Sequence, residues 1–391
     1  MDSAVSTRAL DPARPSAGIA PLRFVWLDRL EDVEKLEAQW RKLQARVRER
    51  MAFGSYDYIV PWYREHRGAQ GAILVGTAWR GDELVGIAPL AARRATLSKV
   101  PVRRIDSACH EGDIGEFLIP DDEIEAFEGI LDSLIRRGGA DAIVLKGLSP
   151  GSPRLKAVER VAAKHGRRFA LEPYYYAVVE LNEGYAAYER GLGRKLRGNL
   201  RRRARKMKEM GGGALDRLRS PADPDVVGAY LKRMFAVANK SWKERSGRAT
   251  EERHHRFFSD VAQRANLRGM LDLSILVVGG RDAAFVFGLQ ADGVYYDVMI
   301  SFDHEFASIS PGSLLIQELL RRLPADGIRR LVSHGDYEYK RYWASAFVPQ
   351  TRAIIFCPGV RAALAYAVRY RVPELLNRFR KPAPAGALPR H

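Results

Sequence analysis

The order of strand-like and helix-like segments repeats along the chain, and this repetition limits the fold more than any other feature. In the first half, two runs of strand-forming residues are joined by the short turn "RGDE", which is typical of a β-hairpin. The sequence then predicts a short strand at "EFLIP", a helix, a buried strand, a second helix and a last strand. In order, these segments are 72–79, 84–92, 116–120, 122–137, 141–148, 152–166 and 174–181.

The second half follows the same order after two predicted helices over 225–240 and 250–265. Its hairpin turns at "GGRD", and "WRGDELVG" in the first half resembles "VGGRDAAFVFG" in the second. The strands and helices that follow are predicted over 271–278, 283–290, 294–302, 312–323, 328–334, 337–346 and 351–356. A structural repeat of this kind predicts an α/β protein made of two similar tandem domains, each with a mixed central sheet flanked by helices.

A strongly basic helix separates the two halves. Nine of the fifteen residues from 194 to 208 are Lys or Arg. Apolar residues recur there at steps of three or four, which gives a helix one packed face and excludes a disordered tail; they are Leu192, Leu196, Leu200, Ala204 and Met207. The outer face is either a solvated surface or a contact for phosphates, and in the second case its candidate ligands are Arg194, Lys195, Arg197, Arg201, Arg202 and Arg205.

Charge and composition restrict the partners. The formal net charge of +17 favours phosphates, nucleic acid or anionic membrane surfaces. Two cysteines supply neither a disulfide framework nor a four-ligand zinc site, and we expect no bound metal and a cytoplasmic location. Residues 1–21 are interpreted as a disordered leader, and no apolar run reaches the length of a membrane span. The basic tail, 359–391, is expected to be helical and to pack on the body, with peripheral membrane contact as the alternative.

A short loop in the second half is a candidate anion site. Ser310, Pro311, Gly312 and Ser313 lie directly after a strand and at the start of a helix. Backbone N–H groups at a helix N-terminus bind anions, and glycine allows close approach of a phosphate. The alternative is an ordinary helix start with a serine cap and a proline in the first turn.

Polar and aromatic residues gather in "SHGDYEYKRYW", at the end of the next predicted strand. Open α/β sheets bind ligands at the carboxyl ends of their strands, so this segment is a candidate site. Its residues of interest are Asp336, Tyr339, Lys340, Tyr342 and Trp343. The alternative is a helix cap and a surface ion pair between Asp336 and Lys340, and we expect Lys340 at an exposed helix position in either case.

The order of these pieces resembles the GNAT acyltransferase superfamily, and within it the double-domain CelD/BcsL-like group associated with cellulose and exopolysaccharide synthesis. The resemblance spans about 24–357 and is carried by "FGSYDYIVPWYREH", "ELVGIAPL", "RKLRGNLRRRARKM", "YYDVMISFD", "SPGSLL" and "GDYEYKRYW". The arrangement is also similar to the Fem-type peptidoglycan aminoacyltransferases, which consist of two fused GNAT-like domains with a helical insertion.

The resemblance implies acyl transfer from acetyl-CoA or another acyl-CoA to an amine or hydroxyl of a small molecule or saccharide. It also implies that the 310–313 loop holds the CoA pyrophosphate, although this chain has only Gly312 where the superfamily loop has two small residues. Fem-type enzymes use aminoacyl-tRNA instead, so a tRNA donor stays open. At the equivalent place in the first half, Asp121 and Asp122 would repel a phosphate, which indicates a non-catalytic partner domain.

Acyl transfer requires a base, a donor for the oxyanion and a group that stabilises the leaving atom. By position in the family fold, Asp336 is the first candidate for the base and Asp297 the second. Tyr339 or Tyr342 is the candidate acid, and Lys340 would hold a phosphate or stabilise the leaving group. Trp343 is assigned to substrate binding, and a backbone N–H of "YYDVMIS" to the oxyanion.

Three functions therefore compete. The first is an acyl-CoA-dependent transferase that acts on a sugar or cell-envelope precursor, the second is an aminoacyl-tRNA-dependent transferase, and the third is a non-enzymatic protein that binds an anionic polymer on a GNAT scaffold. The predicted organisation is the leader, a first GNAT-like domain, a basic bridge, a second and catalytic GNAT-like domain, and the tail, over 1–21, 22–182, 183–212, 213–358 and 359–391.

Overall fold

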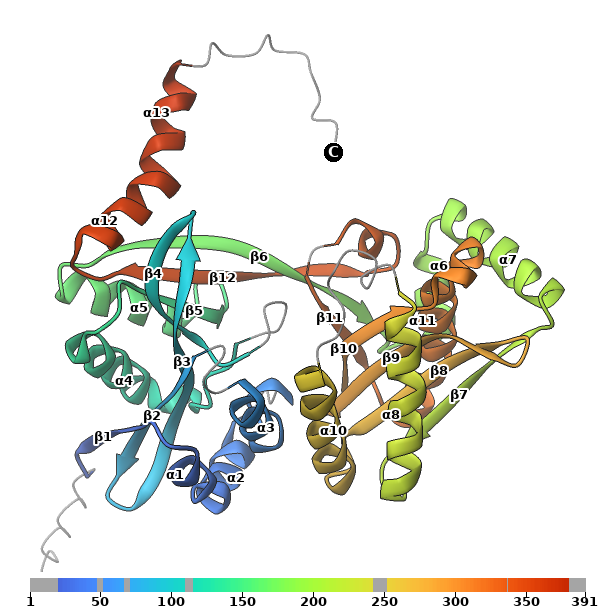
Figure 1. Cartoon of the computed structure of the whole chain (residues 1–391), viewed down its shortest axis with the longest axis horizontal. Coiled ribbons are helices and arrows are strands. Elements are labelled where there is room, and N and C mark those ends of the chain that lie inside the picture. Colours follow the sequence, from blue (N-terminus) through green and yellow to red (C-terminus); the bar gives the residue numbers. More distant parts are fainter. Residues whose placement is uncertain are drawn as a thin grey trace, which may run out of the picture.

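The computed structural model describes residues 20–47, 52–66, 71–109, 115–241, 252–335 and 337–379. Twelve strands of this part of the chain form one continuous sheet, in the order β1-β2-β3-β4-β5-β12-β6-β11-β10-β9-β8-β7 (Figure 1). The strands of the first half are β1 Leu22–Leu27, β2 Ala72–Arg80, β3 Glu83–Leu97, β4 Val100–Ser107, β5 Ala142–Leu148 and β6 Arg168–Glu180. Those of the second half are β7 Gly213–Arg219, β8 Leu271–Val278, β9 Arg281–Ala291, β10 Val294–Phe302, β11 Arg330–His334 and β12 Ala346–Phe356.

Both predicted hairpins are confirmed as antiparallel pairs, β2 with β3 and β8 with β9. Three strands were not predicted. β1 is a short run, whereas β4 ("VPVRRIDS") and β7 ("GALDRLR") carry charges that conceal the strand pattern. The strand expected around "EFLIP" is reduced to a single bridge between Leu118 and Ile87.

The two halves exchange their last strands. β6, from the first half, pairs with β11 of the second half, and β12, from the second half, pairs with β5 of the first. β6 and β12 also pair with each other, antiparallel, from Ala346 opposite Val178 to Phe356 opposite Arg168. The two halves therefore share a single sheet, and the backbone hydrogen bonds of these strands join them.

Helices cover both faces of this sheet. One face carries a core that runs across both halves and includes buried residues of α1 Leu30–Glu34, α2 Glu37–Arg46, α3 Tyr56–His66, α8 Pro224–Asn239 and α10 Glu252–Leu267. The other face is divided between the halves. α4 Ile124–Arg137 and α5 Pro153–Lys164 cover the first half, whereas α6 Gly184–Gly191, α7 Arg194–Glu209 and α11 Pro311–Arg322 cover the second.

The basic bridge is confirmed as a packed helix, α7. Leu200 is buried, and Leu196, Ala204 and Met207 pack against the core of the second half. The predicted bridge 183–212 contains two helices, since α6 precedes α7, and α7 contacts α11 and the 3₁₀ segment His304–Ile309 that precedes α11.

The tail is helical as far as the structure describes it. It consists of α12 Val360–Tyr366, a π-helical turn Ala367–Arg371 and α13 Val372–Phe379. α12 packs on β4 and β12, and α13 continues away from the sheet (Figure 1). Among the described residues, no helix combines the length and the apolar character needed to cross a membrane.

Candidate active site

The site is organised by the point at which β10 and β11 separate. These parallel strands pair only from Val294 to Tyr296 on β10 and from Arg330 to Val332 on β11. β10 then has an irregularity against β9 between Asp297 and Met299 and continues to Phe302. A bulge of this kind bends a strand and re-aims its side chains. The backbone edges of the two strands are therefore no longer paired with each other beyond Tyr296 and Val332.

Asp297 lies at this separation and is buried. One carboxylate oxygen, Oδ2, accepts a hydrogen bond of 2.5 Å from Oγ of Ser333, the next residue of β11. Burial raises the pKa of Asp297 above its usual value, because a low-dielectric surrounding disfavours the carboxylate. The charges of Lys340 and His334 and the Ser333 hydrogen bond oppose this rise without cancelling it. The result is a carboxyl group whose pKa is displaced towards neutrality.

Lys340 differs from the prediction, which placed it at an exposed helix position. Its residue is only 3% exposed, and its ammonium group donates a hydrogen bond to the carbonyl oxygen of His334. The segment is a 3₁₀ helix, Glu338–Tyr342, with a tighter turn than an α-helix, and it directs Lys340 onto the end of β11. Burial lowers the pKa of Lys340, and the charge of Asp297 opposes that shift. The charge of each group therefore shifts the pKa of the other. The sequence had instead predicted an ion pair between Lys340 and Asp336 as the alternative.

The first half of the chain contributes an aromatic ring to this site. Phe53, in the 3₁₀ turn Ala52–Gly54, meets Tyr296 and His334 edge to face, at ring-centroid distances of 5.6 and 6.1 Å. Ser333, His334 and Phe53 were not among the predicted site residues. Ser333 and His334 end a strand, so the rule about strand carboxyl ends could have nominated them. No local signal in the sequence could have brought Phe53 to β11.

The start of α11 lacks the serine cap considered above. Ser310 has a left-handed backbone (φ 48°), and its side chain makes no capping hydrogen bond. The N–H groups of Ser313 and Leu314 donate to the Ser310 carbonyl oxygen (3.0 and 3.4 Å). Pro311 has no N–H. Of the N–H groups in the first turn of α11, that of Gly312 is therefore the one without a backbone acceptor in the described part of the chain. A side chain at Gly312 would have room, because an added Cβ meets only Ile300 Cδ1, at 4.0 Å.

The cations of α7 have no carboxylate partners within the described ranges. Arg194, Lys195, Arg201, Arg202 and Arg205 are exposed, and Arg197 is half-buried. The structure gives only one hydrogen bond for this set, from Arg202 to Asn199. The outer face of the helix is therefore an uncompensated positive surface, on a helix that contacts α11 and the 3₁₀ segment before it.

The remaining predicted residues are dispersed. Tyr342 is exposed, and Trp343 is buried in the core of the second half, where its carbonyl oxygen accepts a 2.6 Å hydrogen bond from the Tyr188 hydroxyl. Asp336 and the side chain of Tyr339 lie outside the described part of the chain. The structure thus brings together Asp297 and Lys340, and it gives Trp343 a packing role.

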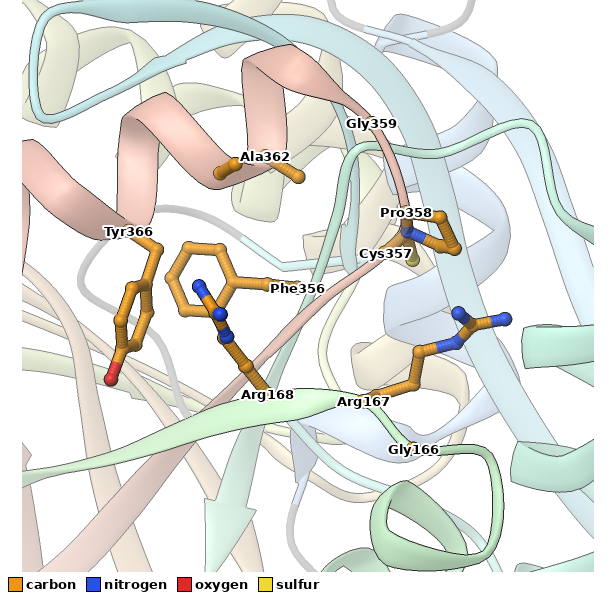
Figure 2. Close-up of a pocket in the computed structure, with 10 residues that line it drawn as sticks. Gly166, Arg167, Arg168, Phe356, Cys357, Pro358, Gly359, Ala362 and Tyr366 are labelled. Carbon is orange, nitrogen blue, oxygen red and sulfur yellow. The ribbon is translucent and has the colours of Figure 1, made fainter.

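A hollow of about 300 Å³ lies elsewhere, between the loop before β6 and the start of α12 (Figure 2). Arg167 and Arg168 line it together with Phe356, Cys357 and Tyr366. None of the predicted catalytic residues lines it. The described residues also contain no group of three or more His, Cys, Asp or Glu arranged to hold a metal ion.

Comparison with known proteins gives a family match for part of the chain and similar solved structures. Residues 194–341 match the family described as "Acetyltransferase (GNAT) domain". The structure is similar to the crystal structure of FemX, with a TM-score of 0.55 at 11% identity, covering 86% of this chain and 98% of that one. It is also similar to a tandem GNAT protein from the clavulanic acid biosynthesis pathway, with a TM-score of 0.48 at 14% identity, covering 87% and 100% of the two chains. The comparison with curated proteins gives no match.

Residues 194–341, which hold Asp297, Lys340 and the start of α11, therefore match a GNAT acetyltransferase domain, and the chain as a whole has a fold similar to that of FemX.

Proposed function

We propose that this protein is an acyl-CoA-dependent N- or O-acyltransferase that acts on a sugar or cell-envelope polysaccharide precursor. The observation that carries the proposal is the buried pair at the separation of β10 and β11, where the pKa of Asp297 is raised and Lys340 is held close by its bond to the His334 carbonyl. A carboxylate with a pKa nearer to neutral is a better general base than an ordinary surface aspartate.

The separated strands also suit an extended ligand. Backbone edges that are no longer paired with a neighbouring strand can form hydrogen bonds with amide groups of a bound molecule. The pantetheine arm of CoA carries two amides, and its pyrophosphate would extend towards the Gly312 N–H at the start of α11. The positive end of the helix and the cations of α7 favour the phosphate charges.

The proposed reaction assigns a proton to each step. The acceptor amine or hydroxyl gives its proton to Asp297 while its nitrogen or oxygen bonds to the acyl carbon of the thioester. The tetrahedral intermediate then collapses, the C–S bond breaks, and the CoA thiolate takes a proton from Tyr339 or Tyr342, the candidate acids. Lys340 supplies positive charge while negative charge develops. Asp336 remains an alternative base.

The first half is proposed to be a non-catalytic partner. At the place equivalent to the start of α11, the exposed side chains of Asp121 and Asp122 precede α4. The adjacent Glu123 is buried and paired with Arg80 at 3.0 Å. Carboxylates here disfavour a bound pyrophosphate, because they add repulsion where the second half offers an open amide.

A second function is favoured by one observation. The uncompensated cations extend along the sixteen residues of α7, and a long positive surface suits the backbone of a nucleic acid. An aminoacyl-tRNA-dependent transferase is therefore the alternative, with the same Asp297 and Lys340 acting on an ester instead of a thioester.

Titration calorimetry with CoA, acetyl-CoA and an aminoacylated tRNA separates the two functions. Saturable binding of CoA, followed by transfer of a labelled acetyl group to a member of a panel of amino sugars and oligosaccharides, would support the first. Binding of charged tRNA without binding of CoA would support the second. A protein that binds neither donor would contradict both.

A further inference from the structure

The C-terminal helix, α12 to α13, exposes large apolar side chains to solvent. Four of the ten exposed large hydrophobic residues in the described chain lie on it. They are Val360, Leu364, Val372 and Leu375, which are 85, 51, 44 and 50% exposed. Single exposed apolar residues are common on protein surfaces, but a group on one element marks a site of interaction.

The π-helical turn brings these residues into one stripe. With about 100° per residue in an α-helix, and no interruption, the four positions would spread over about 120° around the axis. A π-turn inserts about one extra residue. The insertion rotates Val372 and Leu375 back by about 100° around the helix axis and narrows the angular range of the four side chains to about 80°. The irregular turn Ala367–Arg371 thus aligns the apolar residues of α13 with those of α12.

The opposite face of the helix is fixed to the body, so the stripe has a defined orientation. Ala362 and Ala365 are buried, and α12 packs on β4 and β12. In the π-turn, Arg369 and the Tyr370 hydroxyl both donate to the Glu172 carboxylate, at 2.8 and 2.6 Å. Burial raises the pKa of Glu172, but these hydrogen bonds and the charges of Arg369 and Arg352 together lower it below its usual value, and the carboxylate stays charged.

The charge around the stripe is positive. From residue 360 to the C-terminus the sequence has seven Lys or Arg and one Glu. On the described helix, Arg361 is exposed, and Arg371 lies 3.3 Å from Glu374. Arg167 and Arg168 line the hollow beside the face of α12 that packs on the body, and no carboxylate is among the residues that line it (Figure 2).

We propose that α12–α13 is an interfacial helix that binds an anionic lipid surface. Its apolar stripe would enter the boundary between headgroups and acyl chains, and its arginines would contact lipid phosphates, which is how basic amphipathic helices bind membranes. A second copy of this chain fits the stripe less well, because it would bring together two molecules with a net charge of +17 each. The inference is independent of the proposed acyl donor, since it rests on a surface that includes none of the candidate catalytic residues.

Vesicle co-sedimentation of the full chain tests this proposal. Wild-type protein should bind vesicles of phosphatidylcholine mixed with phosphatidylglycerol at least about tenfold more tightly than vesicles of phosphatidylcholine alone. Leu364→Ser, Val372→Ser and Leu375→Ser together should reduce binding to the anionic vesicles by at least about tenfold. The matched control is Val226→Ser with Leu267→Ser, two exposed apolar residues on α8 and α10, and it should bind like wild type.

A charge variant keeps the proposal testable if the apolar variant folds poorly. Arg361→Gln with Arg371→Gln leaves the stripe intact and should weaken binding to anionic vesicles but not to neutral ones. Equal binding of wild type to both vesicle types, or no binding to either, would overturn the proposal. It would also be overturned if sedimentation equilibrium found a dimer that the apolar variant converts to a monomer, since the stripe would then be a contact between copies of the chain.

Discussion

Substitution of Gly312 by aspartate gives the sharpest test of the acyl-CoA proposal. If the start of α11 receives the pyrophosphate, Gly312→Asp adds a carboxylate next to the phosphate charges. Two unit charges about 4 Å apart interact by about 4 kcal/mol at an effective dielectric constant near 20. We therefore expect CoA affinity to fall by a hundredfold or more, since about 1.4 kcal/mol corresponds to a factor of ten.

The same substitution should spare the fold. An added Cβ meets only Ile300 Cδ1, at 4.0 Å, which is an ordinary van der Waals contact. A carboxylate near a helix N-terminus stabilises the helix by about 0.3–1 kcal/mol. The effects on ligand affinity and on the free energy of unfolding therefore have opposite signs.

Isothermal titration with CoA and thermal unfolding measure the two effects separately. Gly312→Asn is the matched control, because it adds nearly the same volume without the charge and should lose much less affinity. If Gly312→Asp bound CoA as tightly as wild type, the phosphate site would have to lie elsewhere. If wild type bound no CoA, the acyl-CoA proposal would fail and the aminoacyl-tRNA alternative would take its place.

Three other predictions follow from the site and the packing. Because burial raises the pKa of Asp297, the acidic limb of the pH–rate profile for transferase activity should lie above the usual aspartate range. Lys340→Met should move this limb to higher pH, because it removes a charge that lowers the pKa of Asp297. An unmoved limb would show that Lys340 does not act on the base. A triple variant, Arg201→Gln with Arg202→Gln and Arg205→Gln, should bind the donor more weakly and with a smaller salt dependence. Its thermal midpoint should stay nearly constant, since no carboxylate is paired with these arginines in the described structure. A lower midpoint with unchanged binding would indicate a purely structural helix. Phe53→Ala should lower the free energy of unfolding by about 3–5 kcal/mol in denaturant titrations, because Phe53 is 1% exposed and its ring contacts both halves. Phe53→Leu should lower it by less than about 1.5 kcal/mol. Equal effects of the two substitutions would argue against tight packing at this ring.

The sequence by itself determined the elements whose residues form a clear apolar pattern. The hairpins of β2 with β3 and β8 with β9 are apolar runs joined by short polar turns, and α7 places its leucines on one face despite its charge. These patterns predicted two similar α/β halves, because a short apolar run marks a strand buried on both faces and a helical spacing marks the one buried face of a helix. The sequence also nominated Lys340, which lies in a segment after the carboxyl end of a predicted strand, whereas Asp297 was nominated by its position in the family fold that the chain resembles.

Only the tertiary structure decided which strands and side chains that are distant in the sequence become neighbours. The exchange of β6 and β12 depends on hydrogen bonds between strands far apart in the chain, and a local pattern carries no information about such pairing. The burial of Lys340, its coupling to Asp297 and the approach of Phe53 to His334 arise in the same way, because the pKa and the surroundings of a side chain depend on neighbours that the fold supplies. The stripe on α12–α13 depends on both the sequence and the tertiary structure. The sequence provides its apolar residues and arginines, whereas the π-turn and the contact with Glu172 determine which face of the helix remains exposed.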